Sequence, residues 1–397
     1  MNLTLKPRSR LLWALPMIAL LAGCDAGNNA GKETAKDEPA KPHAVATYVS
    51  APWDALPAVS DSDLLAGFES WRSACQRLKA DPVWGTTCAA AATVPGNAMA
   101  VRSFLQERLD VFGLRSADNT PNGLITGYYE PVYPGSLTKT ATAHVPVYGV
   151  PDDLIIVNLE SIYPELKGKR LRGRLEGRVL KPYDDAGAIN GQGSTAKPIA
   201  WLTDPMDLQF LQIQGSGRIQ LKDGRQLRVG YGDQNGYPYR PIGRWLVEQG
   251  ELKKEDVTMG AISAWAKAHP ERIPQLLASN PSYVFFSARP DSNEGPRGSL
   301  NVPLTAGYSV AVDRKVIPLG SLLWLSTTKP DGTPLARPVA AQDTGGAITG
   351  EVRADLFWGT GNAAGELAGN MKQQGQIWML WPKGAALPQV PDAPAGS

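Results

Sequence analysis

Apolar residues recur at helical spacing in three parts of the chain. Over 62–79 they fall every three or four positions, which predicts an amphipathic helix. The same spacing continues through Leu109 and Phe112 and predicts a second helix over 101–112. Helical spacing returns over 241–277. We therefore expect helices near the start of the folded region and again in its second half.

From residue 122 onward the pattern is typical of short strands separated by turns. Leucine and isoleucine alternate with Gln212 and Gln214 over 211–214, which favours a strand there as well. Further strands are expected over 124–129, 145–148, 154–159 and 178–181.

Apolar residues over 219–221 and 227–229 flank Asp223-Gly224, a pair typical of a hairpin turn. After residue 280 the chain is again strand-like almost to Trp381. This predicts a fold class that is mainly β with flanking helices.

A β-rich middle between two segments of mixed character suggests a domain inserted into a discontinuous main domain. The main domain would comprise 47–133 and 240–385, and the inserted one 134–239. Residues 386–397 would form a disordered tail. No internal repeat is present.

The first residues predict export and anchoring. Leu11 to Ala22 form an apolar run of about 18 Å as a helix, too short for a hydrocarbon core of about 30 Å. With cationic residues before it, the run is typical of a secretory signal over 1–23. Leu21-Ala22-Gly23-Cys24 resembles the lipobox of bacterial lipoproteins, in which the cysteine carries lipid. The alternative is an ordinary signal with a bystander cysteine.

We expect 24–46, which has almost no large apolar side chain, to be a flexible tether. The anchored protein would face the periplasm. We favour the outer membrane, although Asp25 leaves the inner membrane open.

Composition excludes several classes of function. A net charge of +2 lacks the basic excess that nucleic-acid binding needs. Three histidines and three cysteines show no zinc-ligand spacing, and there is no phosphate loop or nucleophile elbow. We expect no metal and no organic cofactor. In an oxidising compartment Cys75 and Cys88 would form a disulfide, the alternative being two buried thiols.

Three aspartates in the last third differ from the others. Asp313, Asp343 and Asp355 each lie beside apolar residues and near glycines, where backbone or ligand can approach closely. An apolar setting favours the neutral form of a carboxyl group, which can then act as an acid near neutral pH. The alternative is a set of turn-forming and helix-capping aspartates.

Several motifs together resemble the family of membrane-bound lytic murein transglycosylase A. They are GYYEP at 127–131, QIQGSG at 212–217, GDQNGYPY at 232–239, NPSYVFF at 280–286 and GSLNVPLT at 298–305. The run over 310–361 resembles the three-aspartate domain that closes that family. The resemblance covers most of the chain after about residue 60.

The resemblance implies a double-psi β-barrel with an inserted smaller β-barrel and a glycan groove between them. It implies cleavage of the β-1,4 bond between N-acetylmuramic acid and N-acetylglucosamine in peptidoglycan strands. The muramic 6-hydroxyl would attack its own anomeric carbon and leave a 1,6-anhydro end. One carboxyl group would then act first as acid and afterwards as base. Complexes with other enzymes of cell-wall synthesis or hydrolysis would be possible partners.

The family's catalytic aspartate matches Asp355. Asp343 is the candidate neighbour that raises the proton affinity of Asp355 or orients the sugar, its alternative being a turn-fixing role at Gly345-Gly346. Asp313 is a candidate for substrate binding, although its place at a turn favours a structural role. Further candidates for substrate binding are Tyr128, Tyr129, Trp358, Gln212, Gln214 and Ser216, the alternative being core packing or a polar barrel face.

Two other functions compete with this one. Asp343-Thr344-Gly345 is the triplet of aspartic proteases, but those enzymes need two triplets and the chain has one. A peptidoglycan-binding lipoprotein without catalysis is the better alternative.

Overall fold

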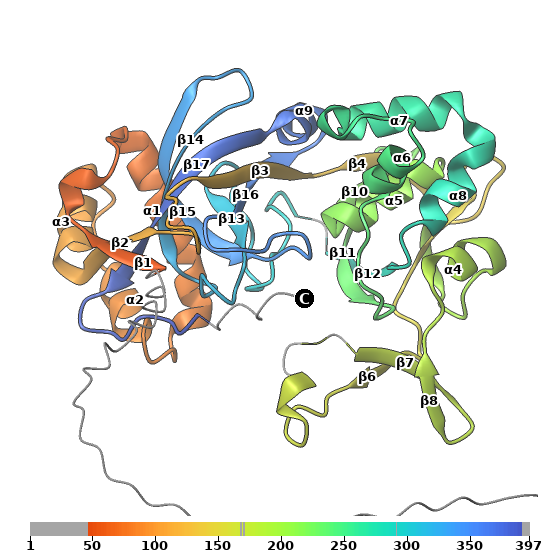
Figure 1. Ribbon diagram of the computed structural model, residues 1–397, viewed down its shortest axis with the longest axis horizontal. Helices are drawn as coiled ribbons and strands as arrows, with labels where there is room; N and C mark the ends of the chain where they lie inside the picture. The colour runs from red at the N-terminus through yellow and green to blue at the C-terminus, as the bar shows by residue number, and fades with distance from the viewer. Residues whose placement is uncertain (1–46, 167–168, 170, 291, 391–397) are drawn as a thin grey trace, which may run out of the picture. The chain divides into compact units, whose positions relative to one another are not determined.

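Figure 1 shows the computed structural model, in which residues 47–166, 169, 171–290 and 292–390 are described. This part of the chain is mostly β-structure with helices, as predicted. The expected signal peptide, Cys24, the tether and most of the expected tail lie outside the described residues. Over the described residues no helix has the length and apolar content needed to cross a bilayer.

The largest sheet joins strands from both ends of the described chain. Its fourth and fifth strands form an antiparallel hairpin, while its seventh and eighth run parallel. In order, its strands are β1 (Tyr48–Ala51), β2 (Leu109–Leu114), β17 (Lys372–Pro382), β14 (Leu322–Thr328), β15 (Pro334–Asp343), β13 (Ser309–Val312), β16 (Ala354–Thr360) and β3 (Gly123–Glu130). β3 also pairs with β17, so the pairings lead from β17 through β14, β15, β13, β16 and β3 back to β17.

The chain between β3 and residue 290 builds two further sheets. One has six strands in the order β12 (Val284–Arg289), β11 (Gln226–Gln234), β10 (Ser216–Gln220), β4 (Val132–Ser136), β9 (Pro198–Leu202) and β5 (Val145–Tyr148). The other has three, β6 (Ile155–Val157), β7 (Leu171–Glu176) and β8 (Val179–Pro182). An ion pair of 2.9 Å between Arg172 Nε and Asp233 Oδ1 joins the small sheet to β11.

Nine α-helices accompany these sheets over the described residues: α1 (Asp61–Leu78), α2 (Gly85–Ala91), α3 (Ala98–Arg108), α4 (Ala186–Gln192), α5 (Pro205–Gln214), α6 (Ile242–Glu248), α7 (Met259–Ala268), α8 (Ile273–Ala278) and α9 (Asn362–Asn370). The helix predicted over 62–79 is therefore confirmed as α1. Ser60 caps this helix by accepting a hydrogen bond from the Asp63 amide, and the apolar face of the helix is buried in the main core. Gly67 allows α1 to lie directly on β15, because a Cβ there would come within 2.3 Å of the Pro338 carbonyl oxygen.

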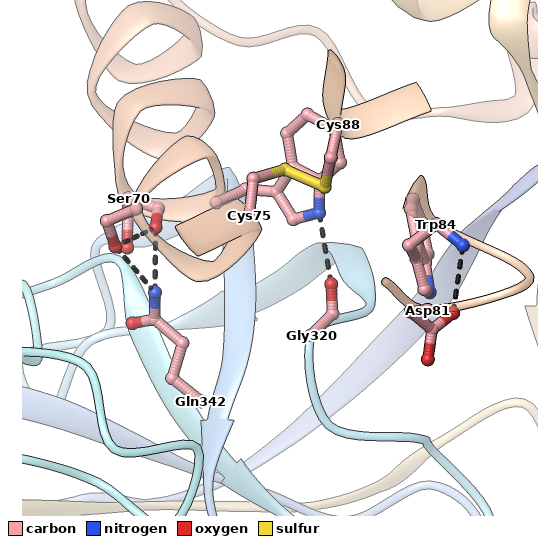
Figure 2. Close-up of a disulfide and its surroundings, with 9 residues drawn as sticks. Ser70, Cys75, Asp81, Trp84, Cys88, Gly320 and Gln342 are labelled. Atoms are coloured by element: carbon pink, nitrogen blue, oxygen red, sulfur yellow. Dashed lines mark hydrogen bonds between the residues drawn. A yellow bond between two sulfur atoms is a disulfide. The ribbon is translucent and has the colours of Figure 1, made fainter. Parts of the chain in front are cut away.

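Figure 2 shows how α1 is fixed to α2 and to the large sheet. Cys75 and Cys88 form the expected disulfide, with their Cα atoms 5.3 Å apart. Beside it, Gln342 is fully buried and donates through Nε2 to the Ser70 carbonyl oxygen at 2.7 Å and to Ser73 Oγ at 3.0 Å. The end of β15, and with it the backbone of Asp343, is thereby fixed to α1, the helix that carries the disulfide.

Several expected elements are present. β3, β5, β6 and β8 lie at the four predicted strand positions, although β6 is shorter than expected. β10 and β11 form the predicted hairpin, with Gly224 at φ 89° in its turn. α6, α7 and α8 account for the helical pattern over 241–277.

Three predictions of local structure are wrong in whole or in part. Residues 211–214 belong to α5, because Asp204 caps that helix, Pro205 begins it and Gly215 ends it at φ 74°. The helix predicted over 101–112 is confirmed as α3 as far as Arg108, but Leu109 and Phe112 lie on β2, since this segment pairs with both β1 and β17. α9 also interrupts the strand-like region after residue 280.

One buried ion pair links the large sheet to the six-stranded one. Glu130, the last residue of β3, is 1% exposed and accepts through Oε2 from Arg218 Nε at 2.8 Å and Thr360 Oγ1 at 2.7 Å. Arg218, on β10, also donates to the carbonyl oxygens of Ser292 and Glu294. Its guanidinium therefore holds both the segment where the chain leaves the large sheet and the segment where it returns.

We expect Arg218→Met to lower the free energy of unfolding by about 3–5 kcal/mol, because it leaves Glu130 buried without its cation. Chemical denaturation measures this loss. Arg244→Met is the matched control: its partner Glu248 lies on an exposed helix face, so the loss should stay below about 1 kcal/mol. Equal losses in the two variants would contradict a special role for the buried pair.

Candidate active site

The register of four neighbouring strands brings two of the predicted aspartates to the same level of the large sheet. Ala311 on β13 pairs with Asp343 on β15 and with Asp355 on β16, which in turn pairs with Thr126 on β3. Directly paired residues point to the same face of a sheet. Two strand spacings of about 4.8 Å separate the backbones of Asp343 and Asp355 by roughly 10 Å.

The face of β16 opposite Asp355 is buried in the main core. Ala354 and Leu356 belong to the core cluster and are at most 1% exposed, while Asp355 between them is only partly buried. The alternation along one strand therefore separates core residues from the carboxyl group.

Among the described residues, Asp355 has a single hydrogen-bond donor. Its Oδ1 accepts from Thr126 Oγ1 at 2.6 Å, and Thr126 accepts in turn from Arg353 Nη2 at 2.9 Å. Burial raises the pKa of Asp355 to about 6, the Thr126 bond and the Arg353 charge oppose this rise, and the Asp343 charge adds to it. Oδ2 receives no hydrogen bond from the described residues, so it is the oxygen free to carry a proton toward a ligand.

Asp343 is much more fully bonded. Its Oδ1 accepts from the Ser299 amide and hydroxyl, each at 2.9 Å, and from the Thr344 amide at 2.8 Å, while Oδ2 accepts from Tyr128 Oη at 3.0 Å. Burial raises the pKa of Asp343 above its ordinary value, and these four donors oppose the rise. Because hydrogen bonds to a carboxylate favour its charged form, Asp343 is better suited than Asp355 to remain ionised.

Tyr128 interacts with both carboxyl groups, through a hydrogen bond to Asp343 and electrostatically with Asp355. Burial and the charges of Asp343 and Asp355 raise its pKa well above the ordinary value, so the phenol stays protonated and donates to Asp343. Its ring packs against Phe357, with the ring centroids 5.3 Å apart. Together, an acid with a pKa near 6, a fully bonded carboxylate and a fixed phenol can carry out general acid–base chemistry.

Asp313 lies at the end of β13, where it fixes the backbone. Its Oδ1 accepts from the Lys315 amide and its Oδ2 from the Gly350 amide, each at 3.0 Å. It therefore joins the turn after β13 to the segment between Asp343 and Asp355. These contacts are those of a structural residue, the alternative to substrate binding.

The two other aromatic candidates make contacts within the protein. The Trp358 ring is partly buried against the main core, and its Nε1 donates to Met371 Sδ at 3.2 Å. The Tyr129 ring lies on α9, where a Cβ at Gly365 would come within 2.8 Å of it.

The polar candidates from 212–216 do not lie together. The Gln214 Oε1 accepts from the Tyr129 amide at 3.2 Å, which places Gln214 beside β3. Ser216 begins β10 and is partly buried. Gln212 faces elsewhere: it lines a cavity of about 430 Å³ formed by β5, α4, α5 and α8, whose lining includes none of the residues around Asp355.

Three residues that bond to the carboxyl groups or act on them through one neighbour were missed in the sequence. Thr126 lies two positions before Tyr128, and Arg353 lies two positions before Asp355. Since residues two apart on a strand share a face, this spacing could have indicated them. Ser299 is 44 residues from Asp343, and no local pattern indicates that contact. Over the described residues, no group of three or more His, Cys, Asp or Glu is placed to hold a metal ion.

Comparisons with known proteins identify the family of this chain. Residues 124–287 match the MltA specific insert domain and residues 308–381 match the 3D domain. Membrane-bound lytic murein transglycosylase A of Escherichia coli K12 is 35% identical over 287 residues, which are 70% of this chain and 71% of that protein.

Solved structures give the same result. MltA from Neisseria gonorrhoeae has a TM-score of 0.75 and 35% identity, covering 87% of this chain and 94% of that one. Escherichia coli MltA with bound chitohexaose has a TM-score of 0.61 and 27% identity, covering 84% and 94%. The resemblance seen in the motifs is therefore confirmed, and the chain belongs to the MltA family of membrane-bound lytic murein transglycosylases.

Proposed function

We propose that this protein is a peptidoglycan lytic transglycosylase that uses Asp355 as its catalytic acid and base. It cleaves the β-1,4 bond between N-acetylmuramic acid and N-acetylglucosamine and leaves a 1,6-anhydromuramic end. The observation that carries this assignment is the difference between the two carboxyl groups. Asp355 accepts one hydrogen bond and has a pKa near 6, whereas Asp343 accepts four.

The proposed reaction needs only one protein carboxyl group to move a proton. Asp355 donates the proton on Oδ2 to the glycosidic oxygen as the bond from the muramic C1 to that oxygen breaks. The muramic 6-hydroxyl then forms a bond to C1, and its proton returns to Asp355. Since the nucleophile belongs to the substrate, attack is intramolecular, and such positioning is worth about 7–11 kcal/mol.

Asp343 and Tyr128 support this cycle without exchanging the proton themselves. An ionised Asp343 repels a negative charge on Asp355 and so favours its protonated form. It also balances positive charge that develops at the anomeric carbon. Tyr128 holds Asp343 in place through their 3.0 Å hydrogen bond.

Substrate contacts are assigned to residues around these groups. Gln214 at the end of α5 and Ser216 at the start of β10 offer polar groups to the sugar hydroxyl and N-acetyl substituents. Tyr128, Tyr129 and Trp358 offer aromatic faces suited to sugar C–H groups. A relative's structure with bound chitohexaose supports an oligosaccharide ligand. Asp313 acts through the backbone it fixes, and Gln212 does not join this group.

We also assign the fold and domains that the family resemblance implies. The pairings that lead from β17 through four strands to β3 and back support a six-stranded double-psi β-barrel. The sheets formed between β3 and residue 290 support an inserted domain over 134–239, with the main domain over 47–133 and 240–385.

The protein is assigned to a membrane that faces the periplasm, held by lipid on Cys24. The relatives named membrane-bound support membrane association, and the sequence pattern favours the outer membrane. A flexible tether over 24–46 would let the enzyme reach glycan strands and other enzymes of the cell wall.

We expect Asp355→Ala to lower the release of anhydro-muropeptides from purified sacculi by at least about 10³-fold, since both proton transfers are lost. Mass spectrometry of the digest measures the product. Asp110→Asn, at an exposed position on β2, is the control and should keep full activity. New reducing ends would indicate a hydrolase, and a wild-type digest without new ends would indicate a protein that only binds peptidoglycan.

Activity should fall as the pH rises through about 6, because Asp355 must be protonated to act as the acid. In Asp343→Asn the like charge is lost, so the pKa of Asp355 falls and the alkaline limb moves to lower pH by about half to one unit. Initial rates between pH 4 and 8 measure the shift. An unchanged limb would show that Asp343 does not act on Asp355 electrostatically.

Cys24→Ser should release the protein from the membrane fraction, because one acyl anchor would be its principal attachment. Fractionation followed by immunoblotting measures this. Cys75→Ser is the control for loss of a cysteine elsewhere and should leave the protein in the membrane fraction. A Cys24→Ser protein that stays membrane-bound would refute the anchor.

A further inference from the structure

A cavity at one end of the six-stranded sheet is separate from the aspartate site. It has a volume of about 430 Å³ and is lined by residues of β5, α4, α5 and α8. α4 and α8 lie side by side at the end of the six-stranded sheet (Figure 1). A volume of this size is within the range of small-molecule sites.

One face of α5 forms the polar side of the cavity. Pro205, Leu208, Gln209 and Gln212 all line it. They are spaced i, i+3, i+4 and i+7, which puts them on a single helix face. Two glutamine side chains are thus placed beside a leucine and a proline.

Gln209 has unused hydrogen-bonding capacity. It is 4% exposed, and its Nε2 is buried without a partner among the described residues. The nearby Gln212 Nε2 makes only a long bond, 3.4 Å to the Val284 carbonyl oxygen. A buried amide without a partner is destabilising, and a ligand carbonyl can supply the missing acceptor. The terminal torsion of glutamine is broad, so a small rotation turns the amide toward a ligand.

The rest of the lining determines which ligands fit. Ile189, Ile273 and Leu277 supply apolar walls. The lining contains no aspartate, glutamate, lysine or arginine, and its one histidine, His144, is exposed to solvent. A ligand with a full charge would lose its hydration there without gaining a counter-charge, so the site suits a neutral molecule.

We propose that this cavity binds a neutral N-acyl amide, with the acyl carbonyl accepting from Gln209 and the acyl methyl lying against Ile189 and Ile273. The site goes beyond the proposed reaction, which needs no second ligand. Two sources share this chemistry, the N-acetyl group of an amino sugar and the backbone of a short acylated peptide.

Methyl-labelled NMR of the mature protein tests the site, because Ile189 and Ile273 provide reporters in the cavity while Ile348 reports on the turn after Asp343. Methyl N-acetyl-β-D-glucosaminide and N-acetyl-D-alanine amide are the two probes. We expect saturable shifts of Ile189 and Ile273 with at least one of them, and none with methyl β-D-glucoside, which lacks the acyl amide. Shifts with the sugar alone or with the peptide amide alone identify the source.

The matched variants are Gln209→Leu and Gln249→Leu. Gln209→Leu removes the unpartnered amide at nearly constant volume and should weaken binding about tenfold. Gln249 is exposed after α6 and lines no part of the cavity, so its variant should bind as the wild type does. Gln209→Met, a second apolar variant, should match Gln209→Leu, and the methyl spectrum itself reports whether each variant is folded.

Three results would overturn the proposal: no shift of the cavity methyls, equal shifts with methyl β-D-glucoside, or unchanged affinity in both Gln209 variants. Asp355→Ala should keep the shifts of Ile189 and Ile273. Failure of the catalytic assignment and failure of the cavity assignment are therefore distinguishable.

Discussion

The contact between Arg218 and Glu130 is the constraint on which the relation of the two larger sheets depends. Each charge would be strongly unfavourable alone, because both side chains are nine-tenths buried or more. Arg218 also holds the carbonyl oxygens of Ser292 and Glu294, and neighbouring Arg228 donates to that of Gly295 at 2.9 Å. Two arginines paired across β10 and β11 therefore fix the chain both where it leaves the large sheet, at Glu130, and where it returns to it, at 292–295.

Residues of the aspartate site come from both of these segments. Thr126 and Tyr128 precede Glu130 on β3, and Ser299 follows the returning segment by a few residues. The donors to Asp355 and Asp343 thus come from parts of the chain that the buried ion pair holds in place. Asp343 is also fixed from α1, the helix that carries the disulfide. The residue before it, Gln342, donates a hydrogen bond to the Ser70 carbonyl oxygen on that helix (Figure 2). The carboxylate is therefore positioned through the backbone as well as by its own hydrogen bonds.

Much of the fold could be predicted from the sequence, and two of the three aspartates singled out there lie at the same level of the large sheet. Strong periodicity gave α1, and the Asp223-Gly224 turn gave the β10–β11 hairpin. The errors arose where local pattern and tertiary context disagree. Capping by Asp204 and Gly215 decides the conformation of 211–214, while pairing with two strands decides that of Leu109 and Phe112. The roles of Arg218 and Ser299 could not be predicted, because cross-strand register and long-range contacts leave no local spacing.

The alternation along β16 limits how this protein can change in length. A slip of one residue against β13 or β3 would put Leu356 in the place of Asp355 and the carboxyl group in the core, so an insertion or deletion in this strand removes acid and packing together. The loops that connect the strands between β3 and residue 290 are less restricted, because loop-closure entropy grows only slowly with length. Among diverging copies of this gene, gains and losses of residues should collect in the loops beyond Glu130 and spare the seven residues of β16.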